Sequence, residues 1–143
     1  MGHRLGKDAT FQIEDNGSTL RAIRTDLTSV TLSFTADSPE HTAFGDSDRQ
    51  RLGGGLRDWS IDISGHWNDT ATTGVDAILF GLYQASTNYI TRVRACPGGS
   101  TAGYPVYTGS GILTGYNPAA TVDGVVGVSA TIIGSGSIVR STL

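Results

Sequence analysis

Side chains that could perform acid–base or metal chemistry are few in this chain and match no known catalytic pattern. The three histidines, His3, His41 and His66, belong to no recognised metal-ligand arrangement of His, Cys and acidic residues. Asp46-Ser47-Asp48 begins like a calcium-binding loop, but the third acid, the internal glycine and the closing glutamate are missing. Surface or interface positions are the simpler interpretation of these residues.

Glycine-rich and nucleophile motifs are also incomplete. Gly53-Gly54-Gly55 is not followed by the Gly-Lys-Ser/Thr that completes a phosphate-binding loop. No serine stands in Gly-x-Ser-x-Gly, the commonest hydrolase signature. The single cysteine, Cys96, follows Arg92 and Arg94, which would activate a thiol on a shared surface, but a buried or incidental thiol is favoured. The sequence therefore predicts a protein that is not an enzyme and carries no cofactor or metal.

Length and composition predict one domain, spanning residues 1–143, with a core of its own. The chain has 143 residues, 20 of them glycine, and only 16% are charged. Its net charge of −3 argues against tight nucleic-acid binding, which needs a basic face. One cysteine allows no internal disulfide, and no apolar run resembles a signal peptide or a membrane span, so we expect a soluble protein made in a cytoplasm.

The periodicity of apolar residues predicts a mainly β fold. Asp58–Trp67 and Thr28–Thr35 alternate most clearly, with Trp59, Ile61 and Ile63 on one face of the former. We expect a small β-sandwich or barrel of roughly seven or eight strands with one flanking helix. The expected strands are Thr10–Glu14, Thr19–Arg24, Thr28–Thr35, Asp58–Trp67, Asn88–Cys96, Tyr104–Tyr116, Gly124–Gly134 and a short one near Ile138–Arg140.

One segment changes to a helical period. Val75, Ile78, Leu79 and Leu82 follow the spacing of a single helix face, which predicts an α-helix over about 74–84. Thr73 and an acid three residues later suggest a capping box at its start. The apolar face of this helix should cover an open face of the sheet.

The stretch Ala36–Asp58 separates the two clearest strands and is too long for a hairpin turn. Loops of this length in compact domains usually have a function. This one mixes acids, three arginines, an apolar Phe44 and the triple glycine, without a catalytic pair. We expect it to become ordered against another protein chain, and an ordinary solvated loop is the alternative. The interface residues that we predict in it are His41, Phe44, Asp46, Asp48, Arg49, Arg51 and Arg57.

Several segments resemble the tail tube (major tail) proteins of long-tailed bacteriophages. They are Gly6–Ala9 before the first strand, Asp37–Asp46, Gly55–Ile61, Gly65-His66-Trp67 before the helix, and Gly124–Thr131 followed by Gly134-Ser135-Gly136. The resemblance covers most of the chain, and it depends on the order and spacing of these segments.

The resemblance implies a structural virion protein, assembled in the host cytoplasm. Six subunits would form a ring, and stacked rings would form a hollow tail tube that conducts DNA during ejection. Ala36–Asp58 would reach across subunits and rings, and the arm Gly2–Asp8, with Lys7 and Asp8, would do likewise. Partners would be tape-measure, tail-tip and tail-terminator proteins, with DNA as transient cargo and no membrane bound by the subunit.

The charge of the chain agrees with passage of DNA. Six copies at −3 give −18 per ring, which favours a lumen that repels the phosphate backbone. We expect Ser, Thr and Gly with a few acids to line the channel. The alternatives are another ring-forming virion protein, such as a tail terminator, and a monomeric β-sandwich module that binds carbohydrate or a cell surface. Such a module would need an aromatic platform, for which Tyr104, Tyr107 and Tyr116 are the candidates.

Overall fold

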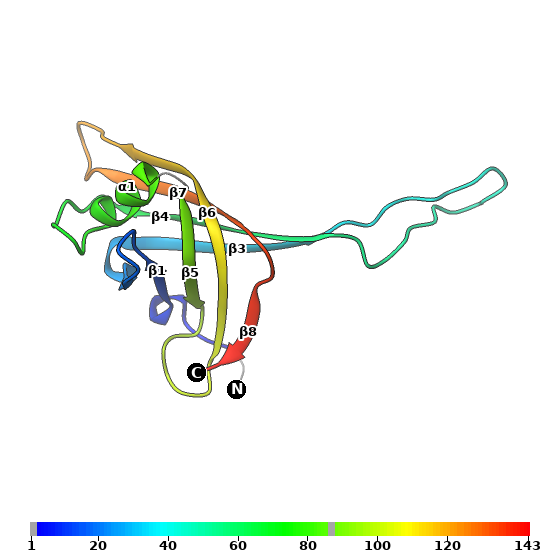
Figure 1. The fold of residues 1–143 in the computed structure, drawn as a ribbon, viewed down its shortest axis with the longest axis horizontal. Helices are drawn as coiled ribbons and strands as arrows, with labels where there is room; N and C mark the ends of the chain where they lie inside the picture. Colours follow the sequence, from blue (N-terminus) through cyan, green and yellow to red (C-terminus); the bar gives the residue numbers. More distant parts are fainter. Residues whose placement is uncertain (1–2, 86–87) are drawn as a thin grey trace.

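The computed structural model describes residues 3–85 and 88–143, and these residues form eight β-strands and one α-helix (Figure 1). Two short 3-10 helices, η1 (Gly6–Asp8) and η2 (Arg24–Asp26), lie near the N-terminus. The other elements are β1 (Thr10–Glu14), β2 (Leu20–Ala22), β3 (Leu27–Ala36), β4 (Arg57–His66), α1 (Val75–Gln84), β5 (Tyr89–Cys96), β6 (Pro105–Ala119), β7 (Gly127–Gly134) and β8 (Val139–Thr142). The predicted mainly β fold with one flanking helix is confirmed.

All eight strands belong to one antiparallel sheet, in the order β2-β1-β5-β6-β7-β4-β3, with β8 paired to β6. The 15-residue strand β6 is its centre: it pairs with β8 over Pro105–Thr108 and with β7 over Gly111–Ala119. Apolar side chains from both ends of the sheet, such as Phe11 on β1 and Ile63 on β4, belong to a single buried cluster. The sheet therefore curls around one core, and α1 packs against it beside β6 (Figure 1).

Strands β3 and β4 differ in burial although both alternate in the sequence. Trp59, Ile61 and Ile63 of β4 are buried, as the alternation predicts. On β3, Val30 is only half-buried and Phe34 is 51% exposed. The difference follows from position in the sheet, because β4 lies between two strands and β3 forms an edge. An exposed edge with apolar side chains is a surface that soluble proteins usually cover.

Glycines on β6 and β7 make room for the indole ring of Trp59. A Cβ at Gly109 would fall 2.7 Å from a ring carbon of Trp59, and one at Gly134 would overlap the ring. The indole Nε1 donates a hydrogen bond to the Gly136 carbonyl over 3.1 Å. The glycine at position 109 of β6 thus permits the close approach of a side chain from a neighbouring part of the sheet.

Helix α1 begins at Val75, with Gly74 as its N-cap. The predicted capping box is wrong, because no side chain caps this helix. The Asp76 carboxylate instead accepts a hydrogen bond of 2.7 Å from the Tyr116 hydroxyl on β6. Burial, together with this hydrogen bond and the charge of Asp76, raises the pKa of Tyr116 above its ordinary value. The residue that looked like a local cap therefore ties the helix to the sheet.

Candidate assembly surfaces

Residues 37–56 between β3 and β4 form a long two-stranded extension, here called the arm, which projects from one side of the body (Figure 1). Asp37 N donates to the Leu56 carbonyl (2.8 Å) and His41 N to the Gln50 carbonyl (2.9 Å). Glu40 and Arg51 form an isolated antiparallel bridge. The segment predicted as a loop is therefore an irregular continuation of the β3–β4 hairpin, with only a few backbone hydrogen bonds between its two sides. A turn at Ala43–Asp46 closes its tip.

The arm is exposed along nearly its whole length. Every residue from Asp37 to Gly54 is exposed, and the Phe44 side chain at the tip is completely so. Leu52 and Leu56 are also largely open to solvent. A long segment that exposes three large apolar side chains and buries almost nothing gains little stability from its own subunit. These features support a role between subunits.

The nine predicted interface residues lie in two separate regions. Six of them are on the arm (His41, Phe44, Asp46, Asp48, Arg49 and Arg51), and Arg57 opens β4 at its root. Lys7 and Asp8 lie on η1, and Lys7 lines a cleft beside the start of β3. Within one subunit the structure does not bring these two groups together.

The N-terminal segment folds back on its own subunit over the residues that the structure describes. The Arg4 guanidinium lies 4.0 Å from the centre of the Tyr104 ring, and Arg24 donates a hydrogen bond of 3.1 Å to the Lys7 carbonyl. Of the predicted arm Gly2–Asp8, Gly2 lies outside the described residues. The described part is packed on the body and does not project as the arm does.

The outer faces of β3, β4 and β7 form a polar surface, defined by Thr31, Ser33, Ser60, Asp62, Ser64, Ser129 and Thr131. Cross-strand pairing aligns them in rows: Asp62 lies between Thr31 and Thr131, and Ser64 lies beside Ser129. Thr131 donates a hydrogen bond of 3.0 Å to the Asp62 carboxylate. None of these strands carries a lysine. Their one arginine, Arg57, is an odd number of residues from Asp62 along β4, so the alternation of the strand places the two side chains on opposite faces. The surface is therefore small, hydroxylated and mildly acidic.

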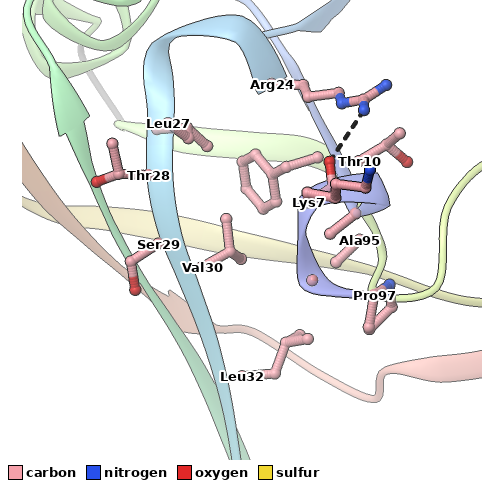
Figure 2. Close-up of a pocket in the computed structure, with 13 residues that line it drawn as sticks. Lys7, Thr10, Arg24, Leu27, Thr28, Ser29, Val30, Leu32, Ala95 and Pro97 are labelled. Atoms are coloured by element: carbon pink, nitrogen blue, oxygen red, sulfur yellow. Dashed lines mark hydrogen bonds between the residues drawn. The ribbon is translucent and has the colours of Figure 1, made fainter. Parts of the chain in front are cut away.

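A cleft that the sequence did not predict lies between the β3 edge and the β1–β5 side of the sheet (Figure 2). Its volume is about 500 Å³. The apolar lining is supplied by Phe11, Leu27, Val30, Leu32, Ala95 and Pro97, and Lys7 and Arg24 add two cations. The alternation of residues along β3 predicted that Val30 and Leu32 share an apolar face. That this face is left partly uncovered by the rest of the chain follows from the curl of the sheet, which the sequence does not show.

The three tyrosines proposed as a carbohydrate platform do not form one. Tyr104 is covered by Arg4, Tyr107 lies 5.5 Å from Phe34 between ring centres, and Tyr116 is bonded to Asp76. Each ring is half-buried and has its own partner within the chain. A monomeric carbohydrate-binding module is thus not supported.

An activated thiol at Cys96 is also not supported. Cys96 is buried at the end of β5. Arg92 pairs with Glu14 (3.5 Å) and Arg94 with Gln12 (3.4 Å), both on the neighbouring strand β1. Among the described residues no group of three or more His, Cys, Asp or Glu side chains is placed to hold a metal ion. No helix in this part of the chain is long and apolar enough to cross a bilayer.

Comparison with solved structures identifies the fold. The chain superposes on the tail of an empty gene transfer agent particle, refined with C6 symmetry, with a TM-score of 0.74 over 97% of this chain and 99% of the other at 18% identity. The chain from the native gene transfer agent virion gives a TM-score of 0.76 over the same shares at 19% identity. The SPP1 tail tube gives 0.78 over 99% of this chain and 80% of the other at 13% identity. The chain has the fold of a tail tube protein.

No protein-family model and no curated protein matches the sequence. The structural comparisons nevertheless confirm the likeness to tail tube proteins that the sequence analysis inferred from short segments. It extends over nearly the whole chain in each comparison.

Proposed function

We propose that this protein is a structural virion subunit that assembles through its arm into six-membered rings, stacked as the hollow tube of a tail. The observation that carries the proposal is a nearly full-length likeness to chains of tails, one of them refined with C6 symmetry. The arm supports it, since a long exposed projection with apolar residues is stabilised only by contact with another chain. In a contact between the arm of one copy and the body of another, the two copies use different surfaces. Such a heterologous contact can propagate into a filament.

The unpaired sheet edge supports closure into a ring. Strand β3 exposes a ten-residue edge, and edges of this kind are protected in many proteins by pairing with a neighbour. If each subunit contributes the adjacent strands β6, β7, β4 and β3 to the wall of the ring, twenty-four strands at a spacing of ~4.8 Å and a tilt of ~40° would enclose a barrel roughly 48 Å across. Subtracting side chains leaves roughly 38 Å, which is wide enough for duplex DNA.

In this proposal the polar surface of β3, β4 and β7 faces the channel. This surface is rich in hydroxyl groups and has no lysine or arginine that could bind the DNA phosphates. Six copies of Asp62 would repel those phosphates. DNA is then transient cargo, and a tape-measure protein would occupy the lumen before ejection. Tail-tip and tail-terminator proteins would contact the two ends of the tube.

Negative-stain electron microscopy of the purified chain at increasing concentration, combined with light scattering, tests the proposal. We expect hollow tubes or six-fold rings. Single rings that never stack would indicate a terminator, since a terminator stops at one ring. A protein that remains monomeric at every concentration, also when tail-tip protein is added as a nucleus, would contradict the proposal.

A further inference from the structure

We propose that the arm tip of one copy docks in the cleft beside β3 of a second copy. Phe44 would enter the apolar part of the cleft, and Asp46 and Asp48 would lie beside Lys7 and Arg24. The inference rests on the proposed self-assembly and adds to it the surface that receives the arm.

The cleft suits an acidic segment that presents one aromatic ring. At about 500 Å³ it lies in the size range of protein sites that enclose small ligands, and its apolar walls come from β1, β3 and β5. Arg24 lies at its edge, where its guanidinium donates to the Lys7 carbonyl (Figure 2). Among the described residues that line the cleft there are two cations and no acid.

The arm tip has the complementary features. Phe44 is completely exposed in the turn Ala43–Asp46, and burying such a ring removes about 150–250 Å² from water. One oxygen of Asp46 accepts the Ala43 N–H at 2.8 Å, which shapes the turn and leaves the other oxygen open. Asp48 follows two residues later on the exposed arm.

The occupant must be a second copy. The cleft lies at the start of β3, around Leu27–Leu32, whereas the arm leaves the other end of this strand after Ala36 (Figure 1). At about 3.3 Å per residue, the extended chain places Phe44 up to about 45 Å from Val30 of the same subunit. The stiff strand β3 prevents the tip from folding back onto its own cleft.

Other hollows on the surface fit the tip less well. The groove beside α1, of about 740 Å³, is lined by Trp67, Phe80 and Tyr83, but the charged side chain in its lining is Asp76, which repels an acidic tip. The hollow at the root of the arm contains both Arg57 and Asp58, so its charges cancel. The hollow near His3 and Arg4 has a mainly polar lining. Charge and apolar surface together therefore favour the cleft beside β3.

Paired cysteines test the docking in assembled protein. One chain carries Ala43→Cys next to Phe44 and Val30→Cys, at a half-buried position whose side chain points into the cleft (Figure 2), and the control chain carries Ala43→Cys with Tyr83→Cys in the groove beside α1. Both are treated with a short bifunctional maleimide under assembly conditions. The native Cys96 is buried, and wild-type and Ala43→Cys protein give the background.

We expect a ladder of covalent dimers and higher species for the Val30 pair and monomers for the Tyr83 pair. A ladder for the Tyr83 pair, or monomers for both pairs while tubes are seen by microscopy, would overturn the docking and leave the tube intact. Absence of any assembled species, also when tail-tip protein is added as a nucleus, would overturn the proposed function, and the docking with it.

Charge reversal provides a second test that does not alter the core. Lys7→Glu and Asp48→Lys should each raise the critical concentration for assembly, by roughly threefold, as expected for an exposed charge pair. The double variant should return to within about twofold of wild type, because each contact again joins opposite charges. Lys7→Glu with Asp69→Lys, an exposed acid outside the arm between β4 and α1, is the matched control and should not recover. Equal recovery in both double variants would contradict the docking.

Discussion

The body and the arm of this subunit are stabilised in different ways. In the body, Ile61, Leu79 and Ile132 are almost completely removed from water, and the sheet curls so that its two ends share a core. In the arm, residues 37–54 are all exposed, and sparse backbone hydrogen bonds join its two sides. The stability of the folded monomer therefore comes from the body, whereas in the proposed assembly the arm is stabilised by contacts with other copies. Changes in the two regions should affect different measurements.

The largest expected effect is on assembly. Replacing His41–Arg51 by two glycines should abolish tube formation, because it removes the tip and the apolar Phe44. The melting temperature and the far-UV circular dichroism of the monomer should stay close to wild type. Tubes from this variant would show that the arm does not hold the assembly together.

The next largest effect concerns the core. Ile61→Ala removes a buried side chain and should lower the free energy of unfolding by about 2–5 kcal/mol, measured in urea. Leu56→Ala on the exposed arm is the matched control and should change it by less than about 0.5 kcal/mol. Equal effects at the two positions would mean that the arm belongs to the monomer's folded core.

Phe44→Ala should weaken assembly without altering the monomer. Loss of an aromatic anchor at an interface commonly costs at least about 1.4 kcal/mol, or tenfold in affinity, so the critical concentration should rise about tenfold or more. Light scattering against concentration measures the change, and urea unfolding should show none. An unchanged critical concentration would exclude Phe44 from the interface.

The smallest expected effect depends on pH and lies at the junction of helix and sheet. The pKa of Tyr116 is raised in the folded state, so above about pH 10 the unfolded chain ionises while the folded chain keeps its proton. The stability contributed by this group is complete below that pH and is lost as pH rises. Tyr116→Phe should reduce the fall in unfolding free energy between pH 9 and pH 11, and exposed Tyr83→Phe should not.

The sequence predicted the parts of this molecule that local patterns determine. Asp58–Trp67 was recognised from strict alternation and is β4 within one residue at each end, and the helix was placed from its apolar spacing. The capping box failed because Asp76 bonds to Tyr116, 40 residues away, which no local pattern reports. An acidic residue in the first turn of a helix, such as Asp76, is compatible both with capping the helix and with a hydrogen bond to a distant tyrosine.

The candidate assembly surfaces were only partly predictable, also for a physical reason. Composition and length marked Ala36–Asp58 as a functional segment, but the segment has no regular period, so its extended hairpin form was missed. The cleft needs β1 and β3 to face each other although they lie far apart in the strand order. Such a site arises from the curl of the sheet and not from neighbouring residues.

Hydrogen exchange in the free and the assembled protein tests the central claim, that the arm is an intermolecular element, most directly. In the monomer, amides across residues 37–56 should exchange fast, because they are exposed and sparsely bonded, while those of β4 and β7 exchange slowly. On assembly, protection should rise strongly in the arm and around η1 and β3, with little change in β4 and β7. Slow exchange of the arm in the monomer, or no gain on assembly, would contradict the claim.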